Sequence, residues 1–118
     1  MAKGDDLQER LIDFAVTIIK LCSKLPKDQV GTHIAGQLLR SGTSPAPNYA
    51  EARGAESKKD FLHKLRIASK ELNETDVWLS MLEKSFLLPI EDIKPVAGEC
   101  EELSRIIGAS IHTTRKNK

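Results

Sequence analysis

Apolar and small residues recur in alternating steps of four and three between positions 61 and 86. This spacing predicts a long helix whose apolar side keeps facing one neighbour, as in helices that pack nearly parallel in a bundle. Ser57 and Asp60 have the spacing of a capping box, which predicts the start of the helix, and Leu88 and Pro89 mark its end. The predicted apolar side consists of Phe61, Leu65, Ala68, Leu72, Thr75, Leu79, Leu82 and Phe86.

Two helical segments precede this long helix. The first is predicted to begin at Asp5 or Asp6, where a carboxylate can cap free amide groups, and to end before Pro26.

The second segment is the weakest, with Thr32 as its expected cap. Pro45 and Pro47 remove amide donors and push the residues before them out of the helical region, so we predict a break or kink there. Asn48 is expected to cap a further turn that ends at Gly54.

A last helix is predicted to begin near Glu91 or Asp92, with Pro95 in its first turn, and to fray from residue 113 onward. No stretch alternates as a strand would. Short connections between four helical segments favour an all-α, up-down-up-down antiparallel four-helix bundle, and residues 1–118 are expected to form one such domain.

The apolar faces of the first and third helices are wider than one neighbour requires. Two interpretations stay open: the extra width fills the core of a single bundle, or it forms a surface between subunits, since monomers avoid large exposed apolar patches. We favour the second. The residues expected at such an oligomer interface are Ile12, Ile19, Ile67, Trp78 and Met81.

Composition is ordinary for a soluble globular protein, with 40% hydrophobic and 30% charged residues. The longest apolar runs are too short to span a bilayer and the start of the chain is unlike a signal peptide, so we expect a cytoplasmic protein with no membrane partner. Cys22 and Cys100 fall on apolar helical faces, where buried free thiols are favoured over a disulfide.

Charge is distributed unevenly although the net charge is only +1. Residues 40–70 hold seven basic and three acidic side chains, whereas residues 71–104 hold two basic and nine acidic ones. In an antiparallel bundle the start of the third helix lies beside the end of the fourth, so basic residues of both would share one end. Such an end would attract polyanions in a salt-dependent way. The residues of this nucleic-acid-binding hypothesis are Arg53, Lys58, Lys59, Lys64, Arg66, Arg115 and Lys116.

Four short segments resemble the signature of the bacterial four-helix-bundle family of 23S rRNA intervening-sequence proteins. They are residues 40–44 (RSGTS), 48–51 (NYAE), 57–61 (SKKDF) and 72–74 (LNE). The chain is similar, more distantly, to the accessory variability protein of diversity-generating retroelements. The resemblance implies a homo-oligomer, commonly a five-fold ring, without established catalytic activity; a role related to nucleic acid is a hypothesis for relatives.

The chain departs from the usual pattern of this family where Pro45 replaces isoleucine and Ala52 replaces glycine, which puts the local backbone near Asn48 in question. The polar pair that matches the family, Asn48 and Glu51, is open to two interpretations, a binding site or a structural device. We favour the structural one, with Glu51 as a partly buried acceptor, because a proline break leaves many backbone groups to satisfy.

Catalytic and metal chemistry have weak support. Asp60 and His63 have a carboxylate–histidine spacing, but a di-iron bundle needs two such pairs directed inward, and His63 is expected to face water. Neither cysteine has a histidine at a neighbouring helical position, and no phosphate-binding glycine loop occurs. We therefore predict a non-enzymatic interaction protein without metal or cofactor that assembles as a homo-oligomer and contacts RNA, DNA or a nucleic-acid-processing partner. The alternative is a bundle that handles a small ligand or a metal.

Overall fold

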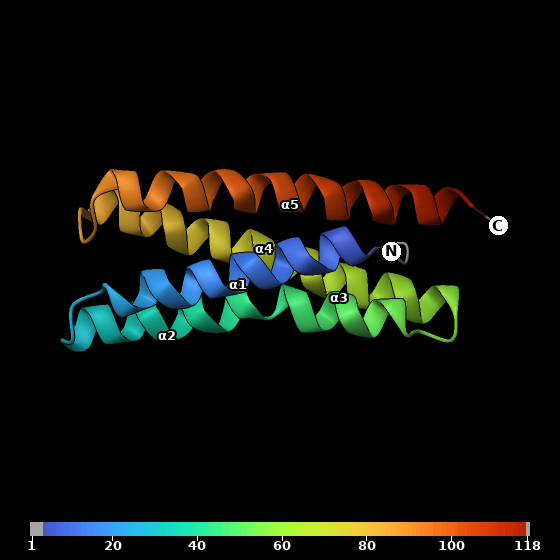
Figure 1. Cartoon of the computed structure of the whole chain (residues 1–118), viewed down its shortest axis with the longest axis horizontal. Coiled ribbons are helices and arrows are strands. Elements are labelled where there is room, and N and C mark those ends of the chain that lie inside the picture. The colour runs from blue at the N-terminus through green and yellow to red at the C-terminus, as the bar shows by residue number, and fades with distance from the viewer. Residues whose placement is uncertain (1–3, 118) are drawn as a thin grey trace.

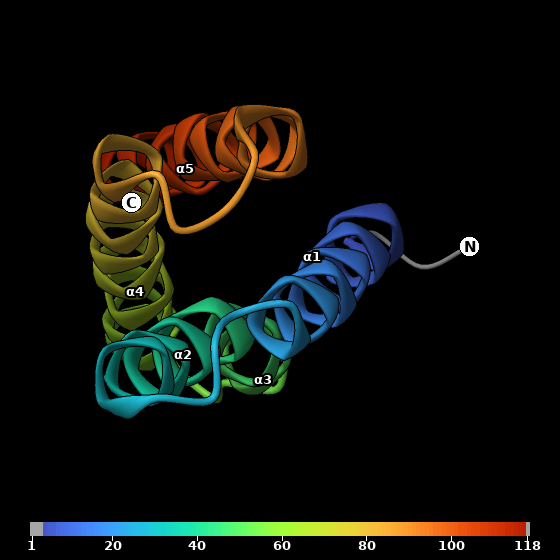
Figure 2. The same ribbon diagram turned by 90° about the vertical axis from the view of Figure 1, so that its left-hand side faces the viewer.

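The computed structural model describes residues 4–117 of the chain and contains five α-helices within them (Figure 1). Helices α2 and α3 follow one another along one line and together form a single arm of the bundle. The resulting four arms run up, down, up and down, as the end-on view also shows (Figure 2). The prediction of an all-α four-helix bundle is therefore confirmed. The helices are α1 (Asp5–Ser23), α2 (Gln29–Thr43), α3 (Pro45–Arg53), α4 (Lys58–Ser85) and α5 (Ile90–Lys116).

The core is built from the apolar stripes that the spacing predicted. On α4 the side chains from Leu65 to Leu82 along the stripe are buried, and Leu11, Ile18, Leu103 and Ile107 meet them from α1 and α5. The prediction for Phe86 was wrong. This residue caps α4 with φ 58°, and its side chain is 88% exposed, because the left-handed turn that ends the helix takes it off the stripe.

The start of α4 agrees with the sequence prediction, whereas the starts of α1 and α2 differ from it. Ser57 caps α4 and accepts a hydrogen bond from the Asp60 amide at 3.0 Å, as predicted. The cap of α2 is Asp28, whose carboxylate accepts from the Gly31 amide at 2.8 Å, so the prediction of Thr32 was wrong by a full turn. The cap of α1 is Gly4, and the two aspartates expected there lie inside the first turn instead.

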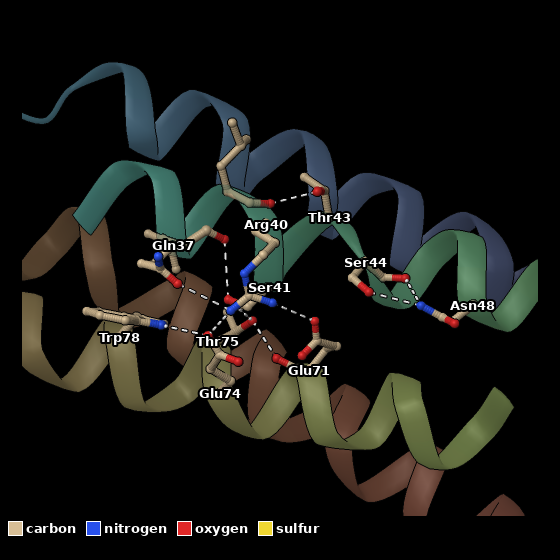
Figure 3. Close-up of polar contacts among 12 residues, drawn as sticks. Gln37, Arg40, Ser41, Thr43, Ser44, Asn48, Glu71, Glu74, Thr75 and Trp78 are labelled. Atoms are coloured by element: carbon tan, nitrogen blue, oxygen red, sulfur yellow. Dashed lines mark hydrogen bonds and ion pairs between the residues drawn. The ribbon is translucent and has the colours of Figure 1, made fainter. Parts of the chain in front are cut away.

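The proline segment interrupts the helix without opening a loop. Ser44 keeps helical angles (φ −71°, ψ −36°), and α3 begins directly at Pro45. Our expectation that the prolines would push Ser44 out of the helical region was therefore wrong. Asn48 lies within α3 rather than at its cap, and its Nδ2 donates to Ser44 O at 3.0 Å and Ser44 Oγ at 2.9 Å (Figure 3). The break is thus a tight junction in which the Asn48 side chain binds back to Ser44, the last residue before the prolines.

Helix α5 begins at Ile90 and continues to Lys116, beyond the residue at which we expected fraying. Pro95 lies in the second turn of α5 rather than the first.

No helix in residues 4–117 is long and apolar enough to cross a bilayer.

Gly42 brings α1 and α2 into close contact. A Cβ atom at this position would lie 2.7 Å from Ile18 Cγ1, so only glycine allows the two backbones to approach this closely here. Cys22 Sγ lies 3.5 Å from Ala35 O farther along the same pair of helices. These two contacts fix the antiparallel register of α1 and α2.

Candidate functional site

Four large apolar side chains are exposed along the outer surface of α1 and α2. Ile12, Val16 and Ile19 share one side of α1, in steps of four and three, and are 40%, 42% and 50% exposed. Leu39, 41% exposed, lies one turn after Ala35 on the side of α2 that faces α1, at the level of Ile19. We call these four residues the α1–α2 apolar face. Sequence reasoning named Ile12 and Ile19 and missed the other two.

A second exposed apolar surface lies where α2 crosses α4. Val77 and Met81 stand one turn apart on α4, Trp78 is half-buried against the His33 ring with centroids 6.0 Å apart, and Val30 precedes His33 by one turn on α2. We call Val30, Val77, Trp78 and Met81 the α2–α4 apolar face. Ile67, predicted to belong to the same interface, is half-buried three turns earlier on α4.

A group of charged side chains on α2 and α4 lies next to Trp78 (Figure 3). Arg40 Nη1 lies 2.9 Å from Glu71 Oε1, and Arg40 Nη2 also pairs with Glu74. Trp78 Nε1 donates to the same Glu74 carboxylate at 3.0 Å. Glu71 is only 8% exposed, so Arg40 compensates a carboxylate that has lost most of its water. Together these contacts connect α2 to α4 and hold their register.

The residues of the predicted basic end lie on α3, α4 and α5, and ion pairs compensate part of their charge. Lys58 Nζ donates to Asn117 O, which confirms that the start of α4 lies beside the end of α5. Arg53 pairs with Asp5 at 2.6 Å, and Lys64 pairs with Glu51 at 2.6 Å. Glu51 is thus an exposed ion-pair partner rather than a partly buried acceptor, and its family-matching neighbour Asn48 supports the α2–α3 junction.

Basic side chain types without an ion-pair partner among residues 4–117 follow the outer surface of α4, where Lys59, Arg66 and Lys70 carry the charge. Lys59, His63, Arg66 and Lys70 recur in steps of four, three and four, and all four are exposed. None of them forms an ion pair within residues 4–117, and the same holds for Arg115 and Lys116 at the end of α5. We call the four α4 residues the α4 basic stripe. Lys70 and His63 were missing from the predicted set, although their helical spacing from Lys59 could have identified them.

Both thiols are buried and hydrogen-bonded to backbone. Cys100 Sγ lies 3.3 Å from Leu72 O, and desolvation by burial raises its pKa to about 12. Burial likewise raises the pKa of Cys22 to about 11. A thiol reacts as the thiolate, so neither cysteine is a nucleophile near neutral pH. Across the described part of the chain, no three His, Cys, Asp or Glu side chains gather where they could hold a metal ion.

The geometry defines a small antiparallel helical bundle with two exposed apolar faces and one basic stripe. Residues 6–109 match the family model described as 23S rRNA-intervening sequence protein, and the chain belongs to this family. Its structure is similar to the crystal structure of a protein with unknown function from the S23 ribosomal protein family of Bacteroides thetaiotaomicron. The two are 34% identical with a TM-score of 0.84, over 89% of this chain and 97% of the other. A search of curated proteins gives no match.

Proposed function

We propose that this protein is a non-catalytic, homo-oligomeric interaction module of the cytoplasm. The observation that carries the proposal is the α1–α2 apolar face, where four large side chains are each at least 40% exposed. At about 25 cal/mol per Å² of apolar surface, covering such a face with protein is favourable, and monomers seldom leave a contiguous patch of this kind in water.

The arrangement of the two apolar faces favours a ring over a simple dimer. The α1–α2 face and the α2–α4 face lie on opposite sides of α2, so one subunit can offer one face to the next subunit and the other face to the previous one. Such head-to-tail contacts generate a closed ring when the rotation between subunits closes. The family resemblance suggests five members.

Light scattering after size exclusion at micromolar concentration tests the assembly. The expected mass is a multiple of the 13.1 kDa chain. Ile19→Lys places a charge in the α1–α2 face and should lower the mass or shift dissociation to higher protein concentration. His112→Lys adds the same group on an exposed part of α5 and should leave the mass unchanged. A wild-type protein that stays monomeric would remove the proposal.

A second function, contact with the nucleic-acid backbone, is favoured by the α4 basic stripe. Its members span about 16 Å along the helix at 1.5 Å per residue, and a ring would repeat the stripe in every subunit. Lysine and arginine on such a surface bind phosphates without sequence preference, and the affinity falls steeply with salt.

Retention of a mixed RNA pool at low salt tests this function. The triple variant Lys59→Glu, Arg66→Glu and Lys70→Glu should lose retention. A matched triple variant, Lys20→Glu, Lys27→Glu and Lys94→Glu, makes the same change in net charge at exposed lysines elsewhere and should retain RNA. Equal behaviour of the two variants would discard the stripe as the contact site.

A further inference from the structure

Phe86 projects into solvent at the turn between α4 and α5. Its side chain is 88% exposed, the highest value among the large hydrophobic side chains of residues 4–117. It ends α4 with φ 58°, and no other residue except glycine has a positive φ in this part of the chain. Glycine or asparagine is the usual residue in this left-handed conformation. Neither the helix cap nor the core therefore requires a phenyl ring here.

A groove of about 790 Å³ lies at the opposite end of the bundle, where α1 begins and α5 ends (Figure 1). Phe61, Ile106 and Ala109 give it an apolar floor, and hydroxyl and amide groups complete the lining. Arg53 is the only charged side chain among the described residues that line it, and Asp5 already pairs with this guanidinium at 2.6 Å. The lining therefore suits an uncharged occupant with a large apolar part.

The charges beside the two features are complementary. Residues 83–92, which flank Phe86, hold three acidic side chains and one basic one, whereas residues 105–117, beside the groove, hold three basic side chains and no acidic one. Glu83 and Glu91 are exposed and form no ion pair within residues 4–117, and the same holds for Arg115 and Lys116. The turn between α4 and α5 and the end of α5 therefore attract each other when two molecules meet.

We propose that Phe86 of one molecule binds in the groove of a second copy of this chain. The phenyl ring packs on the apolar floor beside Phe61, and the acidic turn around it approaches the basic end of α5. The ring and the groove lie at opposite ends of a bundle 49 Å long, so the contact joins unlike ends of two molecules, as head-to-tail interfaces do. It uses neither the α1–α2 apolar face nor the α2–α4 apolar face and is independent of the ring proposed above.

Cross-linking with a short bismaleimide tests the contact. Ser85→Cys and Thr113→Cys place a thiol beside Phe86 and beside the groove, both at exposed positions, whereas the two native thiols are buried. Each variant also carries Ile19→Lys, so that assembly through the α1–α2 apolar face does not contribute. A mixture of the two variants should form a covalent dimer with one chain of each kind, and either variant alone should form none, because like ends do not meet. Equal linking in the mixture and in the separate samples would overturn the proposal.

Further substitutions in the same pair of variants test the ring and the groove. Phe86→Gly suits the left-handed cap, so its melting temperature should stay close to that of the parent, while linking in the mixture should fall about tenfold or more. Ala109→Trp fills the groove from an exposed position and should have the same effect, whereas Ala109→Ser is the matched control and should preserve linking. Glu83→Lys with Glu91→Lys should weaken linking, because like charges then face the end of α5. Linking that survives Phe86→Gly would overturn the proposal.

Discussion

Ser41 and Thr75 face each other across the α2–α4 contact with their hydroxyl oxygens 3.0 Å apart, and neither side chain reaches solvent. Thr75 Oγ1 also lies 2.8 Å from Glu71 O. Removal of one hydroxyl takes a buried hydrogen bond from the other and leaves it with only a backbone carbonyl, Glu71 O for Thr75 and Leu38 O for Ser41. Ser41→Ala and Thr75→Val should therefore each lower the free energy of unfolding by about 1–2 kcal/mol. The double variant should lose less than the sum, as urea denaturation will measure. Strict additivity would show that the two hydroxyls do not interact.

Gly42→Ala should destabilise the protein although alanine favours helix. The new Cβ would lie 2.7 Å from the Ile18 side chain, and overpacking of this kind costs about 1–3 kcal/mol. Gly36 is the matched control: nothing lies within 4 Å of its Cβ position, so Gly36→Ala should gain about 0.5–1 kcal/mol. Thermal unfolding of both variants measures the difference. A stabilising Gly42→Ala would contradict the close approach of α1 and α2.

Asp28→Ala should cost about 1 kcal/mol, because the Gly31 amide loses its acceptor at the start of α2. Thr32 is exposed and caps nothing, so Thr32→Ala should stay within about 0.5 kcal/mol of the wild type. Chemical denaturation of the two variants decides between the observed cap and the one that the sequence suggested. The reverse ranking would place the helix start at Thr32.

Arg40→Ala should lower stability by about 1–3 kcal/mol, since it leaves the mostly buried Glu71 without its counter-charge. The expected loss of stability is smaller than for a fully buried ion pair, because Arg40 is half-exposed. Glu71→Gln in the Arg40→Ala background should recover part of the loss, and a double-mutant cycle measures the coupling. Zero coupling would mean that solvent screens the pair.

Thiol reactivity should follow the raised pKa of both cysteines. At neutral pH the folded protein should react with a thiol reagent only as fast as it opens, and both thiols should become available in denaturant. The folded pKa values, about 11 and 12, exceed the ordinary value of 9.0, so the unfolded chain loses these protons first. Stability should therefore be full below pH 9 and fall as pH rises through this range. Rapid modification of native protein at pH 7 would contradict the burial.

The long periodic stretches allowed the sequence to predict the bundle, because an apolar stripe along α4 requires a packed neighbour over its whole length and short connections make consecutive helices antiparallel. The residues at which the helices begin and end were harder to predict. Asp28 and Thr32 are both good caps by residue type, and only the structure shows that the Asp28 carboxylate accepts from the Gly31 amide at 2.8 Å. Ser44 stays helical before Pro45 because Asn48 and the packing of Ala46 and Tyr49 compensate the local cost.

The apolar face and the basic surface were predicted only in part, because their full extent depends on how different helices are placed against one another. Spacing identified Ile12 and Ile19 as surplus apolar residues, but it could not tell that Leu39 joins them, since that depends on the register that Gly42 sets between two helices. Similarly, the seven basic residues were assigned to one end of the bundle from their positions along the chain. The ion pairs of Arg53 with Asp5 and of Lys64 with Glu51 depend on the three-dimensional arrangement of the helices, which those positions do not give.

Trp78 is the single tryptophan of the chain and lies on the α2–α4 apolar face, with its indole N–H on Glu74 and its ring against His33. The protein therefore contains an intrinsic optical reporter at one of the surfaces proposed for assembly. Its fluorescence emission should shift to the blue when another subunit covers the indole. Dissociation of the assembly on dilution can therefore be followed by fluorescence without attaching a dye.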